Sequence, residues 1–202
     1  MIYFVIAAIA SFLAYLFFFH KSTEISSSSV SKILVDSVTY DVTETGILHP
    51  HKKIVPSVSH FDELVQAILE LAPFKEVYPT LSLHNAVSRI AKMPMAQEYL
   101  KIQKYDLEDP VPFNKSLGYG GVYFENKQKC NYVYVVGNTE DVIKMCTHVL
   151  DKEEIIRVAT KWQKQGLICT AIAAGDIGNN KNVLKRGVKE KMMFLGVLAV
   201  KS

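Results

Sequence analysis

The sequence has few of the features that mark several common protein classes. Its three cysteines, Cys130, Cys146 and Cys169, are odd in number and widely spaced, which excludes a disulfide framework or a zinc knuckle and indicates reduced thiols. No dense block of Lys and Arg occurs and the net charge is only +3, so we expect no nucleic-acid partner. The composition, 49% hydrophobic and 21% charged, is that of an ordered protein.

Charge is also missing from residues 1–19, MIYFVIAAIASFLAYLFFF. At about 1.5 Å per residue this segment nearly crosses a ~30 Å hydrocarbon core. The alternative is a cleaved signal peptide, but that would have a basic start and a shorter apolar run. His20, Lys21 and Lys32 follow the segment, so the positive-inside rule places the rest of the chain in the cytosol. We therefore expect a single-pass membrane protein with a cytosolic C-terminal domain.

The remaining chain alternates strand-like and helix-like segments after a serine-rich linker at residues 20–31. Strands are predicted at residues 32–42, 120–126, 130–136, 167–174 and 192–200, the second and third as a hairpin. Helices are predicted at residues 61–71, 83–92, 95–105, 139–150 and 152–165, with Gly166 following the last. Loops are predicted at residues 43–53 and 106–116. The fold class is therefore α+β, with a twisted, mostly antiparallel sheet and helices packed on it.

One joint between a strand and a helix is unusually clear. Residues 131–150, NYVYVVGNTEDVIKMCTHVL, alternate like a strand, turn at Gly137 and continue as an amphipathic helix. Thr139 is expected as the N-cap of that helix, with Glu140 and Asp141 in its first turn. These roles maintain the fold and need no ligand.

The same joint resembles a segment of the nucleotide-binding domain of P-type ATPases, Lys-Gly-Ala-Pro-Glu-x-Val-Ile-x-x-Cys. Gly137, Glu140 and Cys146 match it in register. In the family's order, PVPFNKSLGYGGVYF resembles its Pro-Phe-x-Ser segment, WQKQGLICTAIAA its Gln-Gly-Leu-Arg-Val-Leu-Ala segment, and MMFLGVLAVKS its Phe-Leu-Gly strand. Upstream, VDSVTYDVTETG resembles the strand that ends in the phosphorylation loop Asp-Lys-Thr-Gly-Thr-Leu. The similarity covers most of the chain.

The resemblance implies a division of the chain. Residues 32–55 would be a phosphorylation-domain-like strand with a degenerate loop, and residues 56–191 a nucleotide-binding-like domain. Residues 192–202 would be the return strand toward an absent phosphorylation domain. Because these two linking segments are neighbours in the family, we expect the last strand to pack beside the strand that begins at Lys32.

The resemblance also implies nucleotide-binding residues. Phe113 stands where an aromatic ring stacks on adenine, and Glu98 in the preceding helix is a candidate acceptor for the adenine amino group. Gly137 and Leu167 match the glycine and leucine of the two motifs that line the nucleotide. The alternative for Phe113 is a buried packing residue, which is the favoured interpretation.

Two cations of the family pattern are missing. Its lysine falls at Val136 and its arginine at Ile168. A hydrogen bond to a charged group contributes about 1.5–3 kcal/mol, so each loss is expected to weaken ATP binding roughly ten- to a hundredfold. We expect ATP to bind weakly or not at all.

The phosphorylation loop is also damaged. If Asp41 is the phosphoacceptor, Val42 replaces the family's lysine and Glu44 its glycine; in the other register Thr43 replaces the aspartate. Phosphoryl transfer needs a carboxylate nucleophile, Mg²⁺ and a cation on the transferring group. Asp41 is therefore interpreted as a surface turn residue, and the chain is expected not to be an enzyme.

No magnesium or other metal site is expected. The family's Gly-Asp-Gly-x-Asn-Asp motif and actuator segment are missing from the sequence, and residues 174–180, AGDIGNN, are interpreted as a turn-rich loop. The histidines in residues 49–51, HPH, have no nearby cysteine or carboxylate and are expected to be solvated.

Three functional interpretations follow. The first is a non-catalytic docking or regulatory module whose partner is a full-length P-type ATPase. The second is the ATP-binding part of a split or truncated cation-transporting P-type ATPase, completed by a complementary subunit. The third is a truncated product without function, suggested by the uncapped apolar end AVKS.

Overall fold

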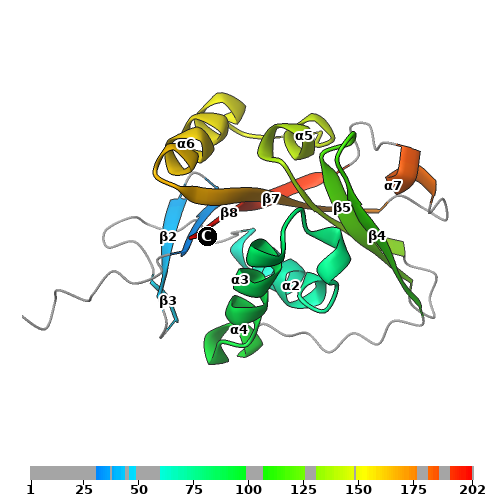
Figure 1. Cartoon of the computed structure of the whole chain (residues 1–202), viewed down its shortest axis with the longest axis horizontal. Helices are drawn as coiled ribbons and strands as arrows, with labels where there is room; N and C mark the ends of the chain where they lie inside the picture. Colours follow the sequence, from blue (N-terminus) through cyan, green and yellow to red (C-terminus); the bar gives the residue numbers. More distant parts are fainter. Residues whose placement is uncertain are drawn as a thin grey trace, which may run out of the picture.

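The described chain forms one eight-stranded antiparallel sheet (Figure 1). The computed structural model describes residues 31–36, 38–43, 46–48, 60–98, 107–125, 131–147, 149–176, 182–186 and 192–201. The strands are β1 (Ser31–Val35), β2 (Val38–Thr43), β3 (Gly46–Leu48), β4 (Leu107–Asn114), β5 (Tyr119–Glu125), β6 (Asn131–Gly137), β7 (Leu167–Gly175) and β8 (Met193–Lys201). Their order is β3-β2-β1-β8-β7-β6-β5-β4, so β1 and β8 lie side by side inside the sheet.

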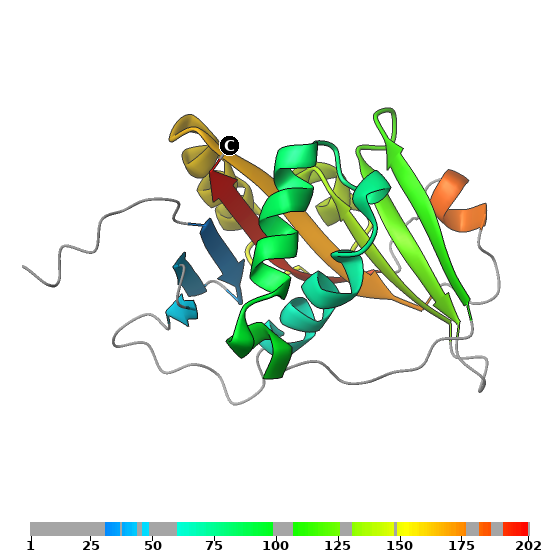
Figure 2. The ribbon, with the colours of Figure 1, turned by 60° about the horizontal axis from the view of Figure 1, so that its bottom comes forward.

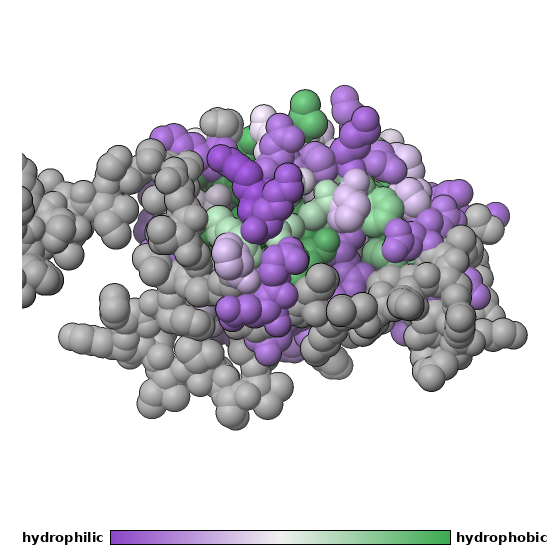
Figure 3. Space-filling view, turned by 90° about the horizontal axis from the view of Figure 1, so that it is seen from below, coloured by the Kyte–Doolittle hydropathy of each residue, from purple (hydrophilic) through white to green (hydrophobic). Residues whose placement is uncertain are grey.

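Helices cover both faces of this sheet (Figures 1 and 2). One face carries α2 (Phe61–Leu71), the short 3-10 helix η1 (Lys75–Val77), α3 (Leu81–Ala91) and α4 (Pro94–Glu98). The other carries α5 (Thr139–Lys144), α6 (Lys152–Lys164) and α7 (Asn182–Arg186). Seen from the α2–α4 side, hydrophobic residues show between hydrophilic ones (Figure 3).

Strand alternation divides the buried residues into two cores. In β6, Tyr134 and Val136 belong to the first core, between the sheet and α2–α4. Val133 and Val135 belong to the second core, between the sheet and α5–α6. Because successive side chains of a strand point to opposite faces, a near-continuous apolar run supplies both cores.

The predicted α+β class and mostly antiparallel sheet are confirmed. β5 and β6 pair antiparallel, as predicted for a hairpin. β8 lies beside β1, with Ile33 opposite Leu198, as expected for the two linking segments. The residues assigned to a phosphorylation-domain-like part and to the return strand therefore contribute strands to the same sheet as the rest.

Helix positions agree in part with the sequence predictions. The helix at Phe61–Leu71 has the predicted bounds, and α3 begins two residues before the predicted start. Gly166, with φ +82°, follows α6 as expected. The helix predicted at residues 139–150 is wrong in length, because α5 ends at Lys144 and Cys146 then bridges to Met192 beside the sheet.

The prediction of a loop at residues 106–116 is wrong, because β4 lies there. Pro110 and Pro112 suggested a loop, since proline cannot donate a ladder hydrogen bond. In the described ranges β4 is an edge strand paired only with β5, and an edge strand tolerates proline. The loop predicted at residues 43–53 likewise contains the short edge strand β3.

The single strand predicted at residues 32–42 is two strands, β1 and β2, joined at a tight turn. Asp36 has φ 47°, in the left-handed region that Asp tolerates in turns. Its carboxylate accepts a hydrogen bond from the backbone N–H of His60 at 3.1 Å and lies 2.8 Å from the Nδ1 atom of the same residue. These contacts join the β1–β2 turn to the residue that precedes α2.

Several predictions fall outside the described residues: the segment at 1–19, most of the linker at 20–31, the histidines at 49–51, the helix beyond residue 98, and most of the loop at 174–180. Among the residues that are described, no helix is both long and apolar enough to cross a membrane.

Candidate functional site

Val136 and Ile168 stand where the resemblance would have cations near a nucleotide, and both side chains lie on the face of the sheet that carries α2–α4. Val136 is fully buried in the first core, and Ile168 packs against the same cluster. Each side chain is aliphatic, so neither position offers a positive charge to a phosphate. Val136 lies opposite Gly120 in the β5–β6 pairing.

The helix η1 lies against Gly120, the residue opposite Val136. A Cβ atom added to Gly120 would lie 2.5 Å from the carbonyl oxygen of Val77 and 2.9 Å from the backbone nitrogen of Phe113. Cβ atoms in proteins are almost never found less than 3.0 Å from another non-bonded heavy atom. The backbone of η1 is therefore in direct contact with β5 at Gly120. The space over Gly120 is filled by the protein itself.

Tyr78 and His84 lie beside this covering segment. Their ring centroids are 5.5 Å apart, and His84 Nε2 lies 3.0 Å from the carbonyl oxygen of Ala72. Among the described residues, the buried Tyr78 hydroxyl and His84 Nδ1 have no hydrogen-bond partner. Burial raises the pKa of Tyr78, so its hydroxyl stays protonated.

Two of the four expected nucleotide-binding residues lie near one another. Gly137 pairs with Tyr119, and Tyr119 pairs with Asn114, the neighbour of Phe113. Phe113 and Gly137 are thus at the same end of the sheet, about 10 Å apart across two strand spacings. The side chain of Phe113 is half-buried, so both of its interpretations, packing residue and stacking platform, stay predictions.

The other two residues lie elsewhere. Glu98 is exposed at the end of α4, which packs near β3, whereas Phe113 is on β4 at the opposite edge of the sheet. Leu167, at the start of β7, packs against the second core on the α6 side. The structure therefore does not bring Glu98, Phe113, Gly137 and Leu167 together into one site.

Asp41 lies in the middle of β2 and not in a turn, which corrects that part of the interpretation. It pairs with Lys32 on β1 and with Leu48 on β3. Its carboxylate forms an ion pair with Lys32, at 2.6 Å between Nζ and Oδ1. The backbone of Asp41 is thus fixed in the sheet on both sides.

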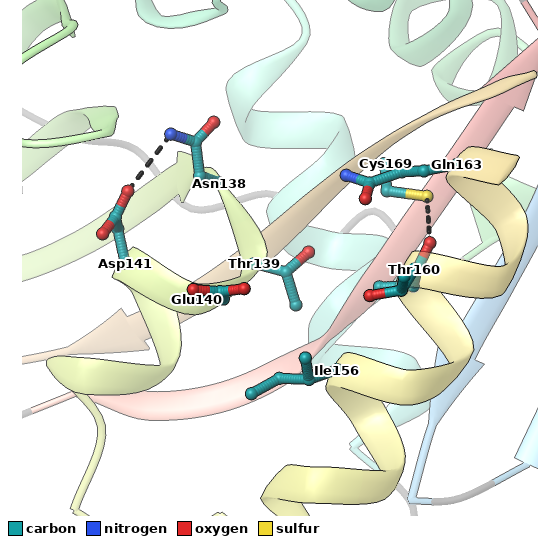
Figure 4. Close-up of a pocket in the computed structure, with 9 residues that line it drawn as sticks. Asn138, Thr139, Glu140, Asp141, Ile156, Thr160, Gln163 and Cys169 are labelled. Atoms are coloured by element: carbon teal, nitrogen blue, oxygen red, sulfur yellow. Dashed lines mark hydrogen bonds between the residues drawn. The ribbon is translucent and has the colours of Figure 1, made fainter.

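A polar cavity lies on the opposite face, between α5, α6 and the start of β7 (Figure 4). Its volume is about 240 Å³. It is lined by Asn138, Thr139, Glu140, Asp141, Ile156, Ala159, Thr160, Gln163 and Cys169. The cavity is open to solvent, and among the described residues its lining contains two carboxylates and no basic side chain.

Thr139 points into this cavity and is not the N-cap of α5. Asn138 occupies the N-cap position, without a side-chain capping bond. Thr139 is 7% exposed, and its Oγ1 has no hydrogen-bond partner among the described residues. Figure 4 shows its side chain directed from α5 toward α6 and β7.

The two carboxylates of the cavity differ in their partners. Asp141 accepts hydrogen bonds from the Asn138 amide at 3.1 Å and from Lys144 at 3.1 Å. The exposed Glu140 has no such bond within the described part of the chain. Glu140 therefore carries the negative charge of this cavity that has no ion-pair partner among the described residues.

The described thiols are not poised for catalysis. Burial raises the pKa of Cys146 to about 12 and that of Cys169 to about 11, so both are protonated at neutral pH and are poor nucleophiles. Cys169 donates to the carbonyl oxygen of Ala159 at 3.5 Å. Within the described ranges, no cluster of three or more His, Cys, Asp or Glu side chains is arranged to hold a metal ion.

No local pattern in the sequence indicates this cavity. In the sequence, Glu140 stands out only as a favourable charge in the first turn of a helix, and Thr139 is expected to cap that helix. Thr160 and Gln163 lie on the polar side of an ordinary amphipathic helix. Only the packing of α6 beside α5 makes these residues neighbours.

Comparison with known proteins assigns no family to the chain. Its sequence matches no protein-family model, and no curated protein is significantly similar to it.

Proposed function

We propose that this chain is a membrane-anchored, cytosolic docking or regulatory module with a fold like that of the P-type ATPase nucleotide-binding domain. It binds ATP weakly or not at all, does not require Mg²⁺ and is not itself an enzyme. Its partner is a full-length P-type ATPase. The membrane anchor is the apolar segment at residues 1–19.

The observation that carries this proposal is the closure of the sheet face at Val136. The position that resembles the family's lysine holds a fully buried valine. The residue opposite, Gly120, lies under the backbone of η1. A nucleotide at this place would meet no cation and would have to displace η1. This arrangement supports a module that has the fold without a nucleotide site and acts through its outer surface.

The position of Asp41 supports a non-catalytic role. A phosphoacceptor must be reached by the γ-phosphate and by Mg²⁺. Asp41 is instead held in a three-stranded part of the sheet and paired with Lys32. If the purified chain took up phosphate from ATP at Asp41, this proposal would be wrong.

An ATP titration of the full chain in detergent micelles, followed by amide chemical shifts, tests the proposal. We expect a folded spectrum that millimolar ATP leaves unchanged. Saturable shifts at Phe113 and Gly137 would instead favour the ATP-binding part of a split cation-transporting ATPase, and co-purification from membranes would then identify the complementary subunit.

The variant Ile168→Arg tests directly whether a nucleotide site exists on this face. It restores the arginine of the family pattern at a partly buried position on the same face. If a nucleotide site exists there, the new cation should tighten ATP binding roughly ten- to a hundredfold. Under our proposal the backbone of η1 fills the space at Gly120, opposite Val136, so the new cation does not tighten ATP binding.

A further inference from the structure

We propose that the cavity between α5 and α6 binds the ammonium group of a lysine side chain. This inference rests on the proposed docking role for the source of the lysine, which is the partner protein. Binding of a lysine compound to the cavity can nevertheless be measured without any partner. A negative result there would contradict this inference and leave the proposed docking role to its own test.

The charge of the cavity selects a cationic group. Within the described part of the chain, its lining contains Glu140 and Asp141 and no Lys, Arg or His. Asp141 is already paired with Lys144, which leaves Glu140 to attract a positive charge. An anionic ligand such as a phosphate would meet repulsion here.

The buried hydroxyl of Thr139 provides a second, independent reason. A buried polar atom without a hydrogen bond is unfavourable and uncommon in folded proteins. The hydroxyl of Thr139 lies at the cavity, directed toward α6 and β7 (Figure 4). A donor entering the cavity would satisfy it.

The arrangement of acceptors fits an ammonium group. Glu140 and Thr139 from α5 and Gln163 from α6 each present an oxygen to the cavity, and a lysine ammonium has three donors to offer. These acceptors come from three side chains on two helices, an arrangement that suits the compact ammonium group.

The size and the walls of the cavity also fit one side chain. Its volume of about 240 Å³ lies below the roughly 300–1,000 Å³ of common small-molecule sites. Ile156 and Ala159 form an apolar part of its wall. The four methylene groups of lysine can pack there while its charged end reaches Glu140.

The test is an amide-shift titration of the full chain in detergent micelles with Nα-acetyl-lysine methylamide. We expect saturable shifts at Thr139, Glu140, Thr160 and Gln163, with a Kd of roughly millimolar order. The Nε-acetylated form of the same compound lacks the charge and should not bind. Equal binding of both compounds, or no saturable shifts at these residues, would overturn the proposal.

Two matched variants separate a specific contact from general charge attraction. Glu140→Gln and Asp141→Asn remove the same charge from adjacent residues. We expect Glu140→Gln to weaken binding roughly ten- to a hundredfold and Asp141→Asn to change it by less than about threefold, because the Asp141 carboxylate already has partners. Equal weakening by both variants would contradict the proposal.

Thr139→Val provides a readout that does not depend on the charge. Valine keeps the shape of threonine without the hydroxyl, so the unliganded protein should be at least as stable as the wild type. The variant should nevertheless bind the lysine compound less tightly. A variant that is folded and binds it with unchanged affinity would exclude Thr139 from the site.

Discussion

A Cβ atom added to Gly137 would lie 2.4 Å from the carbonyl oxygen of Gly118. Gly137 ends β6 and pairs with Tyr119 on β5, so the missing side chain lets the β4–β5 turn lie against the end of β6. Close approach of the backbone, and not a turn, is thus the reason for glycine here. The left-handed φ occurs at Gly118 instead, at +78°.

Gly137→Ala is therefore expected to destabilise the protein by about 1–3 kcal/mol, the usual cost of overpacking. The physical reason is that the backbone of β5 must move to admit the methyl group. Urea denaturation monitored by circular dichroism measures this. The neighbouring Asn138 is exposed and makes no capping bond, and its hydrogen bond to Asp141 is also exposed, so Asn138→Ala should stay within about 0.5 kcal/mol of the wild type. Similar losses in both variants would refute the packing explanation.

Trp162→Ala should cost about 3–5 kcal/mol. Trp162 is 5% exposed and belongs to the second core, against which α6 packs. Removing the indole leaves a cavity between α6 and the sheet. The midpoint of urea unfolding reports the change, with the exposed Lys161→Ala as its control, for which a shift below about 0.5 kcal/mol is expected.

Asp41→Asn should change stability by no more than about 1 kcal/mol, because its ion pair with Lys32 is partly exposed. A double-mutant cycle with Lys32→Met measures the coupling free energy. This coupling should fall as salt is added. A salt-independent coupling of several kcal/mol would show that Asp41 has a role beyond this surface pair.

Stability should fall at alkaline pH because of Cys146. Its thiol has a pKa raised by burial from about 9 to about 12, so the folded state holds its proton where the unfolded state releases it. This contribution is fully present below about pH 9 and is lost as the pH rises toward 12, by up to about 1.4 kcal/mol per pH unit.

The comparison with Cys146→Ala isolates that contribution. The variant loses stability at every pH, but its free energy of unfolding should decline less steeply above about pH 9. Urea titrations at several pH values between 8 and about 10.5 measure both slopes. Identical slopes in the two proteins would mean that Cys146 ionises as readily in the folded chain as in the unfolded one.

Local patterns in the sequence located most of the secondary structure. The apolar spacing of Phe61–Leu71 predicted α2 with its bounds, and Gly166 marked the end of α6. The prolines of β4 led to a wrong prediction, because local chemistry alone cannot tell an edge strand from a loop. Asp36 was likewise predicted as part of a strand, although its left-handed conformation makes the β1–β2 turn.

The candidate sites were harder to predict from the sequence than the secondary structure. The loss of cations at Val136 and Ile168 was visible from the resemblance alone. That η1 lies over Gly120 was not, because this contact joins residues far apart in the chain. The cavity between Thr139 and Gln163 could not be predicted either, because its lining residues come from two helices and a strand.

The sequence by itself determined the class of this fold, since alternation and helical spacing act over a few residues and each segment carries its own pattern. The tertiary structure alone decided what those segments enclose. Packing of η1 against β5 filled the space at Gly120, opposite Val136, and packing of α6 beside α5 left an open polar cavity beside Thr139. Whether a surface is filled or hollow depends on contacts between distant residues, which local patterns do not encode.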